Sequence, residues 1–282
     1  MPELPEVETV ARQLAPLLAG RRVRALQILD QRLAGQSWPD LSGYYIATVE
    51  RCGKRVAIAL TRRRNTPPQR WLCVHLRMTG RLIWVAQTRG ATADERHLRA
   101  RLDLHGGSLL FYDARRFGTL ELCDAHPLGA EKGQDPLSPA LTALALGELL
   151  AGSRQELKPW LMRQDRLAGI GNIYASEILF LAGINPQRPA GALDTAEVAA
   201  LLCATRTVLR KAIKHCGTTF SDFQDSSGEM GGFQRFLKVY GRAGQPCRRC
   251  RGKIERIMQG QRSTFYCPAC QPLPLKPRRG RR

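Results

Sequence analysis

The stretch CRRCRGKIERIMQGQRSTFYCPAC, residues 247–270, decides how the C-terminal part of the chain folds. It begins and ends with a Cys-x2-Cys pair, and sixteen residues separate the two pairs. Each pair can turn two thiolates toward one point, and two such turns supply the four ligands of tetrahedral zinc. The predicted metal ligands are Cys247, Cys250, Cys267 and Cys270. Because protein thiolates would occupy every position, the one Zn²⁺ per chain would be structural; four unligated cysteines are the alternative.

The residues around these cysteines are strongly basic. Glu255 is the single acid in this stretch, against seven cations: Arg242, Arg248, Arg249, Arg251, Lys253, Arg256 and Arg262. The whole chain is basic too, with 44 Lys+Arg, 24 Asp+Glu and a net charge of +20. Such a surface attracts polyanions and releases their counterions on binding. Composition therefore favours a nucleic-acid partner over a basic protein that binds none.

Length and composition exclude several classes of protein. A chain of 282 residues can form two domains, and 43% hydrophobic residues exclude a wholly disordered chain. No apolar run of 18 residues is present, so no membrane span is expected. The first twenty residues lack a basic segment before an apolar one, and nine is an odd number of cysteines, which argues against secretion and a disulfide framework. We expect a location in the cytoplasm or on the nucleoid.

Upstream of the cysteines, the chain changes from strands to helices. Helical spacing is present over residues 7–18, with Pro5 suited to a first turn and Pro16 expected to kink or shorten the helix. Six short strands, typical of a sandwich or barrel, are then predicted at 23–29, 56–60, 71–76, 82–85, 109–112 and 119–123.

Residues 138–216 are rich in Ala and Leu and have the period of helices. The clearest helix runs from Val198 to Ile213, with Asp194 and Glu197 as its capping pair and Gly217 as its end. The glycine-rich residues 217–235 are predicted to form a mobile loop, and the Pro- and Arg-rich end of the chain a disordered tail.

The N-terminus offers a second kind of chemistry. Removal of Met1 would expose the secondary amine of Pro2, whose pKa near roughly 8 leaves a neutral fraction at pH 7. A neutral amine can attack an electrophilic carbon to give an iminium, and Glu3 could transfer a proton. Taken alone, Pro and Glu here are ordinary residues for a helix start, and the pair by itself favours that interpretation over catalysis.

The string PELPEVETV, residues 2–10, resembles the opening of bacterial formamidopyrimidine-DNA glycosylases. Further blocks follow in the order of that family and leave only the basic tail outside the resemblance: GKR around Lys54, HLRMTG (75–80), DARRFG (113–118), KPWLM (158–162), GIGNIYASEILF (169–180), GTTFSDF (217–223), VYGRAGQPC (239–247) and QRSTFYCPAC (261–270).

This resemblance implies an α+β multidomain fold. It implies an N-terminal catalytic β-sandwich with flanking helices over 1–134 and a helical helix–two-turn–helix DNA-binding domain with a lesion loop over 135–238. A zinc-bound β-hairpin finger would follow over 239–271, and a disordered basic tail over 272–282.

The resemblance also implies catalytic roles. Pro2 would attack C1′ of the damaged deoxynucleotide, and Glu3 would protonate the opening sugar. Lys54 would donate a proton in β-elimination, and Arg262 would grip the phosphates during δ-elimination.

Contacts to DNA follow from the resemblance as well. Met78, Arg115 and Phe117 would fill the gap left by the flipped base, although by pattern alone Met78 and Phe117 would be core residues and Arg115-Arg116 a solvated pair. Asn172 would cap a helix whose N-terminus binds phosphate. His97, Arg154 and Lys158 would be further DNA contacts, with Arg99 standing where a second histidine often lies. The loop 217–235 would close over the flipped base.

The implied function is that of a bifunctional glycosylase and abasic-site lyase of base excision repair. Its partner would be double-stranded DNA containing oxidised bases or abasic sites, with 8-oxoguanine and formamidopyrimidines as the foremost lesions and the monomer as the active form. Two alternatives stay open: an endonuclease VIII-type glycosylase for oxidised pyrimidines, and a non-enzymatic zinc-ribbon protein that binds nucleic acid. Ala114, Arg77 and Cys52 depart from the family pattern without removing a functional group.

Overall fold

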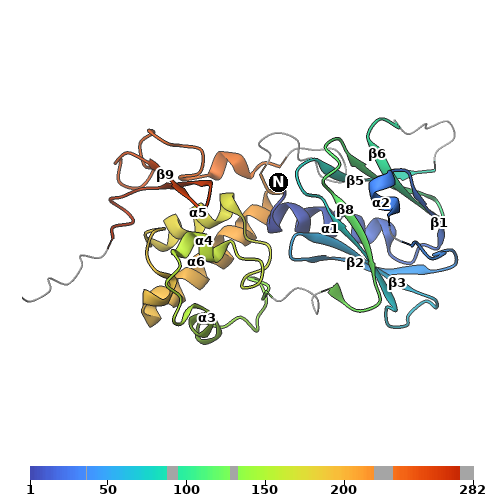
Figure 1. Ribbon diagram of the computed structural model, residues 1–282, viewed down its shortest axis with the longest axis horizontal. Helices are drawn as coiled ribbons and strands as arrows, with labels where there is room; N and C mark the ends of the chain where they lie inside the picture. Colours follow the sequence, from blue (N-terminus) through green and yellow to red (C-terminus); the bar gives the residue numbers. More distant parts are fainter. Residues whose placement is uncertain (36, 88–94, 128–132, 219–230, 274–282) are drawn as a thin grey trace, which may run out of the picture. The chain divides into compact units, whose positions relative to one another are not determined.

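The computed structural model describes the chain except for residues 36, 88–94, 128–132, 219–230 and 274–282. The chain divides into two compact units. Unit 1 comprises Met1–Lys132 with Arg210–Arg235, and unit 2 comprises Gly133–Leu209 with Phe236–Arg282. Figure 1 draws the sheets of unit 1 in blue to green and the helices that follow in yellow-green to orange. Most of the expected mobile loop and of the expected tail lies outside the described residues.

Unit 1 begins with helix α1, Leu4–Leu18, whose apolar face lies in the core as its spacing predicts. Pro16 lies in the last turn of α1, and the helix continues for two more residues before it ends at Leu18. A proline near the last turn disrupts fewer hydrogen bonds than one in the helix interior.

Two antiparallel four-stranded sheets share one core with α1, so unit 1 is a β-sandwich. The first sheet has the order β1 (Val23–Ile28), β6 (Leu98–Leu104), β7 (Gly107–Asp113) and β5 (Gly80–Ala86). The second has the order β2 (Tyr45–Cys52), β3 (Arg55–Thr61), β4 (Arg70–His75) and β8 (Thr119–Cys123). A short helix, α2 (Gln31–Ala34), follows β1.

Strands β2 and β6 were absent from the sequence expectation. Strand β6, LRARLDL, alternates apolar and charged residues and buries Leu98, Ala100, Leu102 and Leu104. A strand with one buried face needs only every second residue to be apolar. Strand β6 therefore lacks a continuous apolar run, which is why the sequence did not predict it.

The Ala- and Leu-rich segment forms helices, as its pattern predicts. Unit 2 contains α3 (Ala143–Leu150), α4 (Leu157–Leu161), α5 (Asn172–Ala182) and a short 3-10 helix at Ala190–Ala192. Helix α6 (Thr195–Lys214) begins in unit 2 and ends in unit 1, and the 3-10 helix at Phe233–Phe236 lies at the unit boundary that follows Arg235. The capping pair of α6 is confirmed, because Glu197 N donates 2.8 Å to Asp194 Oδ1 and Asp194 N donates 3.0 Å to Glu197 Oε2. Gly217, with φ of +75°, follows the helix end as expected.

The cysteine-bounded segment forms a hairpin of β9 (Glu255–Gln259) and β10 (Arg262–Tyr266). Gly260 and Gln261 connect the strands with φ of +53° and +61°, the left-handed values that a tight two-residue hairpin turn requires. The predicted fold class, a sandwich, a helical region and a hairpin finger, is thereby confirmed. In the part of the chain that the structure describes, no helix has the length and apolar character needed to cross a membrane.

Candidate active site and nucleic-acid contacts

The N-terminus of unit 1 is held by an acidic pair at the start of α1. Glu6 Oε2 accepts 2.8 Å from Glu3 N, and both side chains are almost completely buried. Pro2 is buried as well, whereas Met1, which precedes it here, is 41% exposed. The nitrogen of Pro2 is therefore a peptide nitrogen while Met1 precedes it, and it becomes an amine only when Met1 is removed.

The other oxygen of Glu6 reaches a segment that is distant in sequence. Glu6 Oε1 accepts from Thr218 N at 2.7 Å and from Thr218 Oγ1 at 3.1 Å. A Cβ on Gly217 would lie 2.5 Å from the same oxygen, so only glycine fits beside this carboxylate. One buried side chain thus connects the first turn of the chain to residues 217–218.

Lys54 lies in the two-residue turn between β2 and β3. Gly53, with φ of +56°, makes this tight turn possible, and Lys54 is only 7% exposed. Arg51 Nε forms a 2.9 Å ion pair with Glu8, so the end of β2 is tied to the first half of α1. The fold therefore places Lys54 at the end of the sandwich where α1 begins.

His75 joins this end of the sandwich, because it pairs in register with Arg55. Burial and the nearby charges of Arg77, Arg55 and Lys54 lower the pKa of His75 to about 3. Its Nδ1 accepts 3.1 Å from Arg77 N, so the neutral ring carries its proton on Nε2. A neutral hydrogen-bond donor beside Lys54 suits an anionic ligand.

Three side chains expected to enter the DNA are exposed. Met78 is 39% and Phe117 50% exposed, so the pattern-based expectation of core residues was wrong for both. Arg115 is exposed as well, and its guanidinium lies 4.9 Å from the centre of the Phe117 ring. Large apolar side chains left in solvent are typical of residues that contact a partner.

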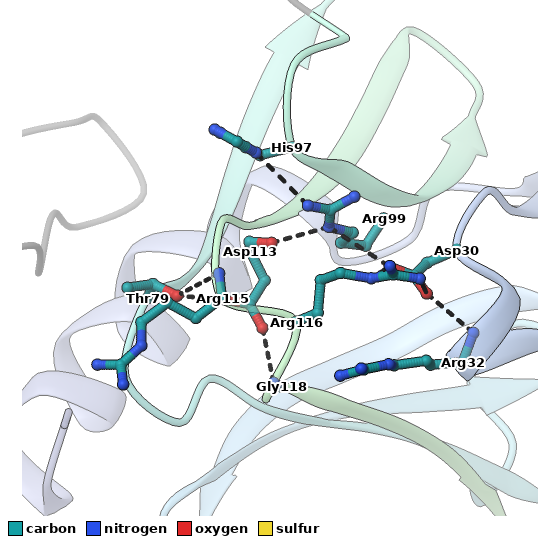
Figure 2. A network of polar contacts seen from close by, with 9 residues as sticks. All are labelled: Asp30, Arg32, Thr79, His97, Arg99, Asp113, Arg115, Arg116 and Gly118. Atoms are coloured by element: carbon teal, nitrogen blue, oxygen red, sulfur yellow. Dashed lines mark hydrogen bonds and ion pairs between the residues drawn. The ribbon is translucent and has the colours of Figure 1, made fainter.

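Asp113 fixes the loop that carries Arg115 and Phe117. Its buried carboxylate accepts from Gly118 N at 2.6 Å, from Arg115 N at 3.2 Å and from Thr79 Oγ1. Figure 2 shows this network, with the Arg115 side chain pointing away from it. The loop backbone is therefore set in advance, and the Arg115 guanidinium remains available.

Asp30 fixes the same loop from the other side. Its carboxylate accepts two 2.7 Å hydrogen bonds from Arg116 and lies 3.5 Å from Arg99 Nε. These arginines, the Arg116 hydrogen bonds first, hold the pKa of Asp30 below its ordinary value. Arg116 is exposed, as expected of a solvated Arg115-Arg116 pair, but its guanidinium is also fixed on Asp30.

Arg99 links this network to His97. Arg99 Nε donates 2.8 Å to the Asp113 carbonyl, and its other end lies 3.5 Å from His97 Nδ1 (Figure 2). The His97 ring is half-buried. Arg99 therefore holds the loop and does not substitute for a second histidine.

In unit 2, three of the sequence-predicted residues come together. The ammonium of Lys158, which is completely buried, donates to Asn172 Oδ1 and lies 3.4 Å from the carbonyl of Ser263. Ser263 follows Arg262, which is exposed at the start of β10. The N-cap of α5 is Gly171 and Asn172 is its first residue, which corrects the expected Asn cap. The start of α5 and Arg262 are thus held side by side.

Glu177 and Tyr240 complete this arrangement. Glu177 is 4% exposed, and its carboxylate accepts from the amides of Lys238, Val239 and Tyr240 at 2.8–3.0 Å. Tyr240 OH in turn lies 3.4 Å from Asn172 Nδ2. The segment before the finger is therefore anchored on α5. Arg154, which precedes α4, is exposed.

The four cysteines of the finger form a candidate zinc site. Their sulfur atoms all lie within 4.8 Å of one another, with Cys247 and Cys270 at 3.9 Å and Cys250 and Cys267 at 3.5 Å. Four thiolates about 2.3 Å from a tetrahedral Zn²⁺ would be separated by roughly 3.8 Å, so these residues fit the ion. The predicted ligand set for one structural zinc is confirmed.

Sequence reasoning missed Glu6, Asp30, His75, Glu177 and Tyr240. Each acts on residues distant in sequence, so only the fold identifies its partners. A signal was nevertheless present for the acids: Glu6 and Glu177 lie on apolar helix faces, where an unpaired carboxylate would be costly.

Family models cover most of the chain. Residues 1–120 match the formamidopyrimidine-DNA glycosylase N-terminal domain, 132–224 the formamidopyrimidine-DNA glycosylase H2TH domain, and 244–273 the zinc finger found in FPG and IleRS.

Curated relatives are similar along their whole length. The formamidopyrimidine-DNA glycosylase of Laribacter hongkongensis is 43% identical and covers 96% of this chain and 100% of its own. That of Symbiobacterium thermophilum is 41% identical and covers 100% and 94%.

Solved structures agree with these relatives. A Lactococcus lactis Fpg variant in complex with Fapy-dG-containing DNA superposes with a TM-score of 0.85 at 30% identity, covering 96% of this chain and 100% of its own. The wild-type L. lactis protein in complex with oxidised-pyrimidine-containing DNA gives 0.83 at 31% identity, with the same coverage.

Proposed function

Because this chain belongs to the formamidopyrimidine-DNA glycosylase family, we propose that Pro2, freed by removal of Met1, is the nucleophile with which it acts on DNA. The protein is a base excision repair glycosylase that acts on oxidised lesions and cleaves abasic sites. The observation that carries the assignment of Pro2 is the Pro2-Glu3 pair of this chain, which Glu6 holds at the beginning of α1 in a protein similar to these glycosylases over 96% of its length. Similarity to these glycosylases along 96% of the chain argues against the alternative of a non-enzymatic zinc-ribbon protein that only binds nucleic acid.

In the proposed reaction, the Pro2 nitrogen attacks C1′ of the flipped deoxynucleotide. The bond from C1′ to the damaged base breaks, and Glu3 supplies a proton to the opening sugar. The resulting iminium joins enzyme to sugar and acidifies C2′, so loss of a C2′ proton expels the 3′ phosphate. A second elimination expels the 5′ phosphate. Lys54 takes part in proton transfer at the first elimination, and Arg262 stabilises the departing phosphate at the second.

The DNA contacts divide by the kind of side chain. Met78 and Phe117 would enter the base stack, and the Arg115 guanidinium would hydrogen-bond the base left without a partner. His97, Arg154 and Asn172 would contact phosphates. The ammonium of Lys158 donates hydrogen bonds to Asn172 and to the Ser263 carbonyl, so we assign Lys158 the role of positioning Asn172. When zinc is bound to the four cysteines, it stabilises the finger that presents Arg262.

We also propose the functional division into catalytic residues 1–134, DNA-binding residues 135–238, finger 239–271 and tail 272–282. As its substrate, double-stranded DNA, is in the bacterial cytoplasm, the enzyme would act there as a monomer, on the nucleoid when bound.

For substrates, we propose oxidised purines, with 8-oxoguanine and formamidopyrimidines foremost. The exposed Met78, Arg115 and Phe117 support this choice. The similar L. lactis protein was crystallised with oxidised-pyrimidine-containing DNA, so oxidised pyrimidines are the second candidate class of substrate. Comparing excision of 8-oxoguanine opposite cytosine with excision of thymine glycol decides between them, and a preference for thymine glycol would contradict the purine assignment.

Borohydride reduction tests the nucleophile. With abasic-site DNA, the parent protein should give a covalent adduct that maps to Pro2 by mass spectrometry. The Pro2→Gly variant, and protein that retains Met1, should give no excision while still binding the same DNA. Normal turnover by either would remove Pro2 from the mechanism.

A further inference from the structure

The ends of the sandwich in unit 1 carry different groups. Arg51 pairs with Glu8 near the start of α1, whereas Gly20, after the end of α1, donates 2.8 Å to Ile46 in β2. Lys54 precedes β3 and residues 62–69 follow it, so the seven residues of β3 separate them by about 20 Å. The end formed by Gly20 and this segment is therefore remote from Pro2, Glu3 and Lys54.

Five arginines gather at this remote end: Arg21, Arg22, Arg62, Arg63 and Arg64, hereafter the far-end arginines. Within the described part of the chain, no carboxylate lies within ion-pair distance of any of them. Asp40 is the exception in part, because hydrogen bonds from Ser42 and then the charge of Arg62 lower the pKa of its carboxyl, although Asp40 forms no ion pair with Arg62. The positive charge of this end is thus only partly compensated.

The fold holds three of these side chains in place. Arg62 lies 4.0 Å from the centre of the Tyr44 ring, Arg64 5.1 Å from Tyr45, and Arg21 4.7 Å from Trp84. Arg21 also donates to the carbonyls of Leu17 and His105. Ordered guanidinium groups lose less side-chain entropy on binding a partner than free ones.

A depression of about 910 Å³ lies among these residues. Arg21, Arg22 and Arg64 line part of it, while Pro16, Leu17 and Ala47 provide an apolar part. Leu17 is 38% exposed, one of the larger apolar side chains left in solvent. The site therefore offers positive charge and an apolar surface together.

We propose that the far-end arginines and this depression bind an acidic peptide segment of a partner protein, with an apolar side chain of that segment entering the depression. Charge complementarity selects carboxylates, and Pro16 and Leu17 accept the apolar side chain. Single-stranded nucleic acid fits less well, because arginines already lie over the rings of Tyr44, Tyr45 and Trp84 on which bases would stack. A phosphate backbone also has no group for the apolar part.

Fluorescence anisotropy with the zinc-loaded full chain tests this proposal. The probe is a labelled peptide of aspartates around one phenylalanine, and the matched probe replaces phenylalanine with serine. Burial of a phenylalanine stabilises by roughly 1.5–3 kcal/mol, so the serine peptide should bind at least about tenfold more weakly. Equal affinity of the two peptides would overturn the proposal.

Variants locate the site. The double variant Arg22→Ala/Arg64→Ala should bind the phenylalanine peptide about tenfold more weakly. The control double variant, Arg163→Ala/Arg210→Ala, removes the same charge elsewhere and should bind this peptide with nearly unchanged affinity. Excision of 8-oxoguanine should be the same for both pairs. An equal loss of peptide binding in both pairs, or a loss of duplex DNA binding in the first pair alone, would overturn the proposal, the latter in favour of nucleic acid.

If the first pair does not fold, Leu17→Asp serves in its place, because that side chain is already partly exposed. It should remove the difference between the two peptides by placing a carboxylate in the depression. A retained preference for the phenylalanine peptide would contradict the assigned position.

Discussion

At the scale of single residues, the site depends on groups whose ordinary chemistry the fold has altered. His75 is the clearest case, since burial and three neighbouring cations lower its pKa to about 3. The folded protein therefore binds fewer protons than the unfolded chain between pH 6.5 and pH 3. Stability that is complete above pH 6.5 is lost progressively as the pH falls toward 3.

His75→Gln should remove this acid sensitivity. Between pH 7 and 4.5 the parent should lose about 2 kcal/mol more unfolding free energy than the variant, because only its unfolded state gains a proton there. Urea unfolding at both pH values measures the difference. The exposed His105→Gln is the control, and an unchanged pH dependence in His75→Gln would contradict a neutral His75.

Gly217 and Gly20 provide a matched pair of substitutions. Both have φ of +75°, but a Cβ on Gly217 would meet Glu6, whereas nothing lies within 4 Å of one on Gly20. Both alanine variants should lose about 1 kcal/mol of stability from the left-handed backbone, and Gly217→Ala should lose more because its Cβ meets Glu6. Only Gly217→Ala should lose excision activity, because it displaces Glu6 from Glu3 and Thr218. Single-turnover excision of 8-oxoguanine compares them, and equal rates would show that this contact is not needed.

At the scale of elements, the loop between β7 and β8 is positioned by residues outside it. Asp30→Asn should weaken the double contact to Arg116 and release the segment carrying Arg115 and Phe117 (Figure 2). We expect a loss of discrimination for cytosine opposite the lesion that exceeds any loss of stability. Excision opposite cytosine and adenine measures it, with Asp40→Asn as the control acid. Unchanged discrimination would restrict Asp30 to a structural role.

The finger is an element that depends on its metal. Cys247→Ala should release zinc and weaken duplex DNA binding by about tenfold, since β10 no longer presents Arg262. Zinc content and DNA affinity are the two measurements, with the exposed Cys203→Ala as the control cysteine. Loss of zinc with full DNA affinity would make the finger peripheral to binding.

At the scale of the whole molecule, the candidate residues divide between the two units: Pro2, Glu3 and Lys54 belong to unit 1, and Asn172 and Arg262 to unit 2. Asn172→Ala should therefore weaken DNA binding by about tenfold through a lost phosphate contact, whereas Pro2→Gly should abolish excision with little change in affinity. Gel-shift binding and excision assays compare the two variants. Equal effects of both on affinity would contradict this division of labour.

Sequence alone determined what local spacing can encode. The Cys-x2-Cys pairs predicted a four-thiolate site, the periodicities of 7–18 and 198–213 predicted helices, and the motif blocks indicated the family. These features depend on residues a few positions apart, where geometry along the chain is nearly fixed. Strand β6 was missed because charges alternate with its buried residues.

Only the tertiary structure decided which side chains share an environment. Thr218 meets Glu6, Arg116 meets Asp30, and Ser263 meets Lys158, across separations of 212, 86 and 105 residues. The exposure of Met78 and Phe117, the low pKa of His75 and the gathering of the far-end arginines likewise follow from folding. Burial and charge neighbourhood belong to the packed chain, because they depend on every element that surrounds a residue and not on its position in sequence.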